Sequence, residues 1–327
     1  MNWEQYKIPA AVVFLAILPV VFFQEGATYI SRIFTIFIMF ATLALALDVA
    51  FGQTDQLLLF TGGIVGIGTY TTVDLAASLG VSLWATILIG GLFAGVVGAV
   101  VCYVAARRQL NVIVISILTI SLQLAMVQTF NALRDITGGN TGMEVPALTA
   151  EAITSTMGWE PLTFLYYLFL LLLTALMVVH HYLTNSKYGL AFDMIRQDEV
   201  SAASTGVAVV RYKAFAGFVA TFFMGLVGPL YVQIGGYATP GMFQFATIDV
   251  LVLIILVVGG MRTIYGPIVG AALIVYVNEA LQAAQEFRTM VFGAMLIVLF
   301  LYFRNGIVRY ARDLAVDRFD LGDRLPG

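Results

Sequence analysis

The stretch LTFLYYLFLLLLTALMVVHHYL, residues Leu162–Leu183, contains no Asp, Glu, Lys or Arg. A helix needs about 20 apolar residues to cross the hydrocarbon core of a bilayer, and this stretch is long enough. The rest of the chain suits the same solvent, because 61% of its 327 residues are hydrophobic and 11% are charged. Soluble domains carry about 25% charged residues. We therefore expect an integral membrane protein.

Nine further runs of similar character predict an all-α, polytopic transmembrane helical bundle of about ten spans. No small-x-small cleavage site follows the first run, so we expect a membrane span there and not a signal peptide. The last three runs are shorter and are interrupted by glycine. Besides Leu162–Leu183, the expected spans are Ile8–Phe23, Ile33–Phe51, Leu57–Ala77, Trp84–Ala106, Val112–Leu133, Ala214–Val232, Ile248–Gly260, Ile268–Leu281 and Met290–Phe303.

The basic residues predict how these spans are oriented. When ten spans alternate from an inside N-terminus, 13 of the 16 Lys and Arg residues fall in the cytoplasm, and only Arg32, Arg134 and Arg288 fall outside. The positive-inside rule predicts such a bias. We therefore expect a multi-pass protein of the cytoplasmic membrane with both termini in the cytoplasm. Residues 1–303 then form a single transmembrane domain, and residues 304–327 form a cytoplasmic tail.

The most polar inner segment before the tail is the loop of residues 184–213. Small and apolar residues recur there at helical spacing and predict a short amphipathic helix over Tyr188–Thr205, which Gly206 would end. Such a helix either lies on the membrane surface or docks into a groove on another protein. Its small residues and balanced charge favour docking. The residues that recur at this spacing are Leu190, Ala191, Met194, Ile195 and Ala202, while Arg196, Gln197 and Glu199 fall elsewhere on the helical wheel.

The early span Leu57–Ala77 is rich in glycine and threonine. Small residues let membrane helices approach closely, and tight packing is the simpler interpretation. The alternative is a broken helix whose free backbone groups contact a zwitterionic solute. The glycines around residues 259–270 present the same choice. The candidate residues of a translocation path are Asp48, Gln56, Thr61, Gly62, Gly63, Gly66, Gly68, Gly259 and Gly260.

Four carboxylates lie within expected spans, near their ends: Asp48, Asp74, Asp249 and Glu279. A carboxylate at the centre of the bilayer costs about 2.5–3.5 kcal/mol on insertion scales, so such residues suggest a function. Near a span end the cost falls, and hydrogen bonding to a neighbouring span is the commoner explanation. Asp48 is the strongest candidate of the four.

Several kinds of chemistry are excluded by what the sequence lacks. Cys102 is the single cysteine, and His180 and His181 are the only histidines, so we expect no metal site and no catalytic cluster. The histidine pair is expected at the headgroup region, where a span ends. A net charge of -3 gives no reason to expect a nucleic-acid partner. No G-x-x-x-x-G-K-[ST] phosphate loop occurs, so the chain does not hold ATP in that manner.

The inner loop resembles the coupling-helix region of the permeases of branched-chain amino-acid ABC importers of the Liv type. Those permeases carry a pattern close to S-x-x-G-x-A-x-x-A-I-R-x-D-E-x-A-A-x-x-x-G-x-x-x-x-x-x-K. The spacing is ungapped apart from one residue near its start. The matching residues are Ser186, Gly189, Ala191, Ile195, Arg196, Asp198, Glu199, Ala202, Ala203, Gly206 and Lys213.

Four more stretches are similar to the family, in the same order along the chain: residues 52–70, 137–142, 225–231 and 259–271. The segment Asp55–Gly62 departs from the family's usual G-Q-L-S-L-G-H-A, because Leu58, Phe60 and Thr61 replace a serine, a glycine and a histidine. If this segment touches the solute, the substrate differs from leucine, isoleucine or valine. Urea and short amides are therefore an alternative substrate class within the resemblance.

The resemblance implies a permease subunit and not an enzyme. It implies two partner ATPase subunits that use ATP, a sister permease in a heterodimer, and an extracytoplasmic solute-binding protein. It also implies that the inner helix couples ATP binding to transport, with polar contacts from Arg196, Asp198 and Glu199 and a packing face that includes Ile195. The chain itself is expected to bind no cofactor.

Another class of function is a stand-alone secondary transporter driven by a proton or sodium gradient. Ten spans, glycine breaks and buried carboxylates suit such a protein. Two expectations oppose it: no span centre carries the carboxylate or histidine pair of a proton relay, and a docking helix would have no purpose.

Overall fold

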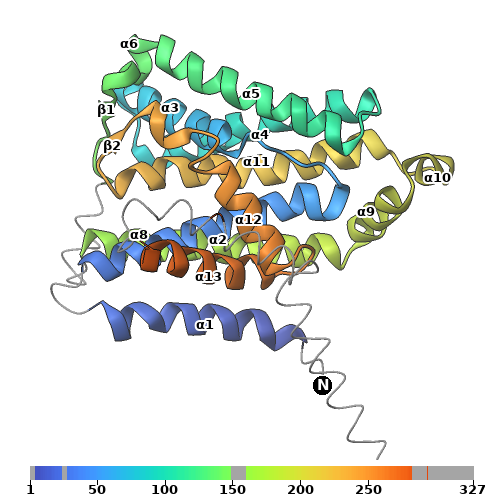
Figure 1. The fold of residues 1–327 in the computed structure, drawn as a ribbon, viewed down its shortest axis with the longest axis horizontal. Helices are drawn as coiled ribbons and strands as arrows, with labels where there is room; N and C mark the ends of the chain where they lie inside the picture. Colours follow the sequence, from blue (N-terminus) through green and yellow to red (C-terminus); the bar gives the residue numbers. More distant parts are fainter. Residues whose placement is uncertain (1–3, 24–27, 149–159, 282–292, 294–327) are drawn as a thin grey trace, which may run out of the picture.

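The computed structural model describes residues 4–23, 28–148, 160–281 and the single residue 293. Within these residues the chain is almost wholly helical, and its long helices lie side by side (Figure 1). The elements are α1 (Glu4–Phe22), α2 (Thr28–Thr54), α3 (Thr61–Leu79), α4 (Leu83–Arg107), α5 (Val112–Ala132), α6 (Arg134–Thr137), η1 (Gly139–Thr141), β1 (Met143–Glu144), α8 (Pro161–Thr184), α9 (Lys187–Gln197), α10 (Glu199–Ser204), α11 (Val209–Gln233), β2 (Tyr237–Ala238), η2 (Pro240–Phe243), α12 (Asp249–Gly259) and α13 (Gly266–Ala280).

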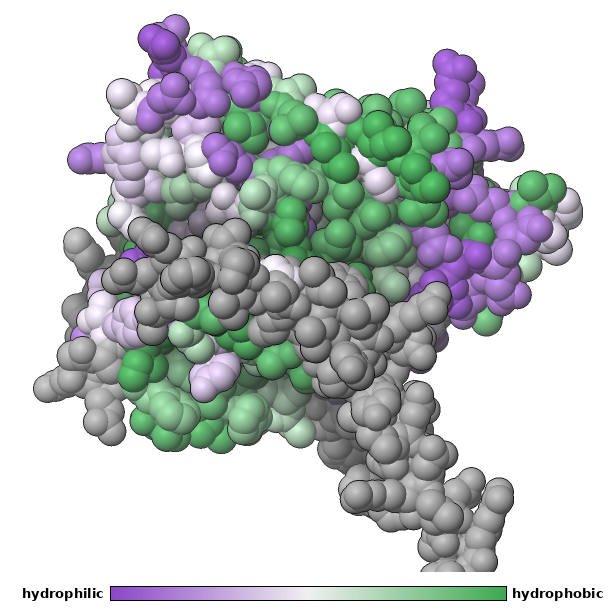
Figure 2. All heavy atoms as spheres, viewed as in Figure 1, coloured by the Kyte–Doolittle hydropathy of each residue, from purple (hydrophilic) through white to green (hydrophobic). Residues whose placement is uncertain are grey.

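The prediction of an all-α polytopic bundle is confirmed. Five of the described helices, α2, α4, α5, α8 and α11, are long and apolar enough to cross a membrane. Figure 2 shows hydrophobic residues across the middle of the visible face and hydrophilic residues gathered toward its two ends. We call these the α9–α10 end and the β1–β2 end after the elements found there (Figure 1).

Nine of the ten expected spans correspond to described helices. The start of one span and the form of the inner-loop helix differ from expectation. The third span was expected from Leu57, but α3 begins only at Thr61, and residues 55–60 form no helix. The helix expected over Tyr188–Thr205 is two helices, because Asp198 has extended backbone angles between α9 and α10. The tenth expected span, Met290–Phe303, and the tail of residues 304–327 lie outside the described residues.

The interior is built around α2, in which every residue from 37 to 50 is buried. α11 packs against α2, and α3 and α4 pack on α11 so closely that glycines of these three helices meet backbone atoms of the facing helix. A Cβ atom at Gly68 would overlap the carbonyl of Gly225, and one at Gly228 would overlap the carbonyl of Val65. Here the simpler interpretation of the glycine-rich span, close helix packing, is correct.

The loop that follows α5 is joined to the segment that follows α11 at the β1–β2 end. The two-residue strands pair antiparallel, with Met143 opposite Ala238 and Glu144 opposite Tyr237. The TGGNTG motif of residues 137–142 makes the preceding turn, where Gly138 and Gly142 both have φ of +72°. Residues other than glycine rarely adopt this backbone conformation. The motif therefore sets the path of the loop.

Replacing Gly228 by alanine tests the close packing of α11 on α3. The added methyl group would overlap Val65, so we expect Gly228→Ala to lower the free energy of unfolding by about 1–3 kcal/mol. The measurement is thermal unfolding of the detergent-solubilised protein. Gly235→Ala is the control, since a Cβ there meets no atom within 4 Å. Equal unfolding temperatures for the two variants would contradict the packing argument.

Candidate functional site

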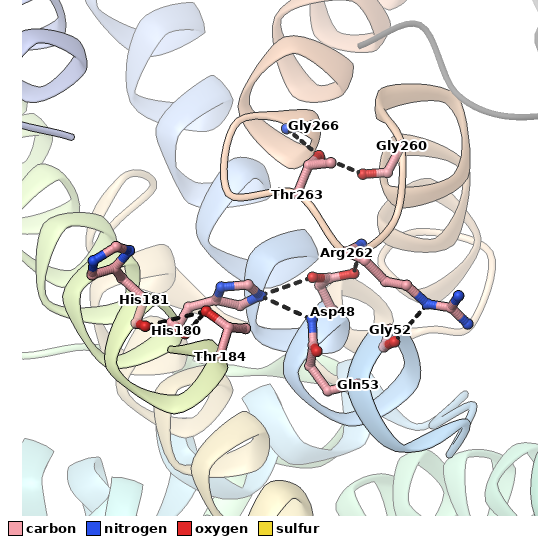
Figure 3. A network of polar contacts seen from close by, with 10 residues as sticks. All are labelled: Asp48, Gly52, Gln53, His180, His181, Thr184, Gly260, Arg262, Thr263 and Gly266. Carbon is pink, nitrogen blue, oxygen red and sulfur yellow. Dashed lines mark hydrogen bonds and ion pairs between the residues drawn. The ribbon is translucent and has the colours of Figure 1, made fainter. Parts of the chain in front are cut away.

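A buried polar network lies near the α9–α10 end, where α2 and α8 run side by side (Figure 3). Asp48 of α2 is fully buried, and its Oδ2 accepts a hydrogen bond from His180 Nε2 of α8 at 2.9 Å. The Gln53 amide nitrogen lies 3.4 Å from the same His180 nitrogen. The other ring nitrogen, His180 Nδ1, is buried and has no hydrogen-bond partner. The pair therefore joins two long helices through a single carboxylate oxygen.

The second oxygen of this carboxylate holds the turn between α12 and α13. Asp48 Oδ1 accepts a hydrogen bond from the backbone N–H of Arg262 at 2.7 Å. The Arg262 side chain reaches back to α2, where its Nε donates to the carbonyl of Gly52 at 2.9 Å. Its Nη2 lies 3.5 Å from Asp55 Oδ1. Arg262 has φ of +65°, so these contacts hold an uncommon backbone conformation in place.

The position of His180 corrects the sequence prediction. It was expected at the headgroup region, but it is 2% exposed and paired with Asp48. The pair lies toward one end of the bundle, so it does not contradict the expectation that no span centre carries the carboxylate or histidine pair of a proton relay. One signal was available: Asp48 and His180 both lie within two turns of the ends of neighbouring long helices, at Thr54 and Thr184.

Removing the charge of Asp48 tests the network. Asp48→Asn keeps one acceptor oxygen but weakens the bonds to His180 and Arg262, and hydrogen bonds to charged groups contribute about 1.5–3 kcal/mol. We expect a loss of that order in the free energy of unfolding of the solubilised protein. Asp74→Asn is the control, because Asp74 is exposed on α3. A variant at Asp48 as stable as the control would show that the network does not hold the helices together.

A second polar cluster lies where the N-termini of α3 and α12 meet. The carboxylate of Asp249, the first residue of α12, accepts hydrogen bonds from the first two N–H groups of α3. Thr61 N donates to Oδ1 at 2.5 Å, and Gly62 N donates to Oδ2 at 3.2 Å. The third N–H, of Gly63, donates to Gln123 Oε1 of α5 at 2.6 Å. α3 is thus capped by side chains from two other helices.

The segment η2 covers this cluster. Gln123 Nε2 donates to the carbonyl of Phe243 at 2.6 Å. The Phe243 ring packs against Tyr70 and Phe130, with ring centroids 5.6 and 6.3 Å apart. Phe243 is fully buried, so these aromatic contacts close the cluster on the η2 side.

The expected path residues have different surroundings. Thr61, Gly62 and Gly63 form the capped N-terminus of α3, whereas Gly66 and Gly68 pack against Phe130 and Gly225. Gly259 ends α12 and Gly260 begins the turn that Asp48 holds, and Gln56 donates to the carbonyl of Lys213 at 3.0 Å. Sequence reasoning did not single out Gln123, Phe243 or Arg262. For Gln123 a signal existed, since it is the one long polar side chain near the middle of the apolar run Val112–Leu133.

The structure divides the expected docking residues into a buried and an exposed set. Gly189, Ala191, Ile195 and Ala202 are buried against the bundle, so Ile195 is not part of an outward packing face. The exposed large apolar side chains are instead Leu190, Met194 and Val200, at 70%, 38% and 73% exposure. Ala203 of α10 is also exposed.

The charged residues of this segment make contacts inside the chain. Arg196 Nη2 lies 2.9 Å from Asp193 Oδ1. Asp198 caps α10, with its Oδ1 accepting from the N–H groups of Val200 and Ser201. Glu199 pairs with Lys213, which is buried at the start of α11. The first two contacts are local to α9 and α10, and the Glu199–Lys213 pair holds α10 on the start of α11.

This architecture defines a class: a polytopic helical membrane protein with buried polar clusters and a pair of short helices at one end. Within that class, the chain belongs to the family described as branched-chain amino acid transport system, permease component, whose model matches residues 29–300. It is therefore a multi-pass permease subunit of the cell membrane and not an enzyme.

Two curated relatives carry the name high-affinity branched-chain amino acid transport system permease protein LivM. The protein of Escherichia coli (strain K12) is 26% identical over 329 residues, which cover 94% of this chain and 76% of the relative. The protein of Salmonella typhimurium (strain LT2) is 26% identical over 309 residues, which cover 88% of this chain and 71% of the relative. No solved structure matches the chain.

Proposed function

We propose that the chain is the permease subunit of an ATP-binding-cassette importer that carries branched-chain amino acids, or closely related small solutes, across the cytoplasmic membrane. Family membership and the names of the two relatives support this function. In this proposal the chain has ten spans, and both termini and the α9–α10 end face the cytoplasm. Residues 1–303 form the permease domain, and residues 304–327 form a cytoplasmic tail.

The observation that carries the proposal is the exposed apolar face of α9 and α10. Leu190, Met194 and Val200 present large side chains at a hydrophilic end of the bundle, while the opposite side of the same helices packs on the permease. An amphipathic helix with an unpaired apolar face suits docking into a groove of a partner. We assign this face to an ATPase subunit, and Ala203 lies within reach of the same contact.

The polar network around Asp48 connects the docked helices to the interior of the permease. Only Asn185 and Ser186 separate α8 from α9, so a movement of α9 displaces the end of α8 that carries His180. His180 and Arg262 share the Asp48 carboxylate, so the displacement reaches the turn between α12 and α13. The other end of α12 carries Asp249, which caps α3. ATP binding by the partner would thus change the polar cluster that η2 covers.

The complete transporter in this proposal contains two ATPase subunits, which use ATP, a sister permease in a heterodimer, and an extracytoplasmic solute-binding protein. The chain itself binds no cofactor. Gly189, Ala191, Ile195 and Ala202 seat the coupling helices on the permease, Gly206 ends them, and Arg196, Asp198 and Glu199 fix their orientation.

Charged substitutions on the exposed face test the docking contact. We expect Leu190→Asp and Val200→Asp to abolish ATP-driven solute uptake and to prevent co-purification of the ATPases, because each would place a carboxylate in an apolar contact. Membrane insertion should be unchanged, since both side chains are exposed. Gln109→Asp, on an exposed turn between α4 and α5, is the control. Normal uptake by the two variants would overturn the assignment.

The Asp48–His180 pair favours a second candidate, a gradient-driven transporter, because a carboxylate and a histidine can relay a proton. The two functions differ in their energy source. Membrane vesicles with an ionophore and internal ATP should keep solute uptake if the chain serves an ATP-driven importer. Uptake that needs a proton gradient and persists without ATP would assign the chain to the second class.

A further inference from the structure

Two helix N-termini converge on one carboxylate in the cluster beneath η2. Asp249 lies at the start of the 11-residue helix α12 and also caps the 19-residue helix α3. A helix N-terminus carries a partial positive charge of about half an elementary charge, so the two ends together place about one elementary charge beside Asp249. No Lys, Arg or His among the described residues forms an ion pair with Asp249. The helix ends are its only described counter-charge.

One polar group of this cluster is left without a partner. The hydroxyl of Thr61, the first residue of α3, is buried beside the Asp249 carboxylate and makes no hydrogen bond of good geometry. A buried hydroxyl without a partner costs free energy unless a ligand or water satisfies it. The first turn of α3 therefore has capacity for one more polar group beside Asp249.

An apolar wall borders the same cluster. Cβ atoms at Gly63 and Gly66 would collide with Met126 and Phe130, so these side chains lie directly against the start of α3. The rings of Tyr70 and Phe243 extend the wall, and both residues are buried, although the Tyr70 hydroxyl has no hydrogen-bond partner. Polar groups that can hold a charged head thus adjoin a surface that can hold an aliphatic side chain.

We propose that this cluster is the binding site for the carboxylate and ammonium groups of an α-amino acid, and that Asp249 takes the place of the solute carboxylate when the site is empty. On loading, the solute carboxylate accepts from the N–H groups of Thr61 and Gly62. Asp249 then stays at the start of α12 and pairs with the solute ammonium group. The aliphatic side chain lies against Met126 and Phe130. This inference rests on the proposed function and assigns it a zwitterionic substrate.

Charge balance is the reason for the assignment. A zwitterion brings one negative and one positive charge, so its carboxylate replaces Asp249 at the end of α3 and its ammonium group becomes the counter-charge of the buried Asp249. Urea brings no charge, so it offers neither an anion to the end of α3 nor a cation to Asp249. The contact between Gln123 and Phe243 closes the cluster in the described state, so η2 must move before a solute enters.

The test uses membrane vesicles that hold the complete importer, with an excess of its binding protein and with ATP inside. Uptake of radiolabelled leucine is compared for the unmodified permease, Asp249→Asn and the exposed control Asp74→Asn. We expect Asp249→Asn to reduce uptake by about tenfold or more through a higher KM, since a buried charge partner is lost, and the control to be unchanged. The asparagine oxygen still caps α3, so the complex should assemble. Unmodified kinetics for Asp249→Asn would overturn the inference.

A competition experiment separates substrate contact from a structural effect. Isocaproate is leucine without its ammonium group, so it should compete poorly in the unmodified importer, where it leaves Asp249 unpaired. In Asp249→Asn it should compete as well as leucine. A purely structural role would lower uptake without changing this ratio. If the complex with Asp249→Asn does not assemble, Asp249→Glu replaces it, because glutamate keeps the charge. Asp249→Glu should alter the KM for leucine and still exclude isocaproate. An unaltered KM would overturn the inference.

The same vesicles separate failure of the inference from failure of the proposed function. An unmodified importer without ATP-dependent uptake of either leucine or urea would overturn the proposed function itself. ATP-dependent uptake of urea, at equal rates for the unmodified protein and Asp249→Asn, would keep the importer but overturn the zwitterion site.

Discussion

A helix that begins inside a membrane protein must find partners for its first N–H groups without bulk water. In this permease six residues separate the end of α2 from the start of α3, and the first three N–H groups of α3 are all bonded to side chains of other helices. The cap comes from Asp249 and Gln123, so α5 and α12 are tied to the start of α3. The placement of η2 follows, because Gln123 also holds the carbonyl of Phe243.

Hydropathy and charge were enough to predict the helices, because a span is a local property of about 20 residues. The helical segment of α9 and α10 was predicted for a similar reason, since its helical spacing and Gly206 are visible in the sequence. The start of α3 was placed four residues too early because Leu57–Phe60 are apolar, and hydropathy does not distinguish an apolar helix from an apolar extended segment. The break at Asp198 was missed, although aspartate is a preferred N-cap residue.

The partners of the buried polar residues could not be read from the sequence. Thr61 and Asp249 are 188 positions apart, and Asp48 and His180 are 132 apart, so nothing local relates them. The burial of Ile195 was equally hidden, because one helical face can pack on its own bundle or on a partner. Four of the path residues, Thr61, Gly62, Gly63 and Asp48, lie in polar clusters, whereas Gly66 and Gly68 serve packing.

The antiparallel pair Met143–Ala238 and the turn at Arg262 bracket the segment that contains η2 and α12. An 11-residue helix is about 16 Å long and resists compression, so α12 acts as a strut between two tethers. Because a short helix bends little, a displacement of one end of α12 moves its other end by a similar distance. The distance between the turn at Arg262 and the cap that Asp249 makes on α3 is thereby set by the length of α12, and a single inserted residue in α12 would change the relative position of these two contacts.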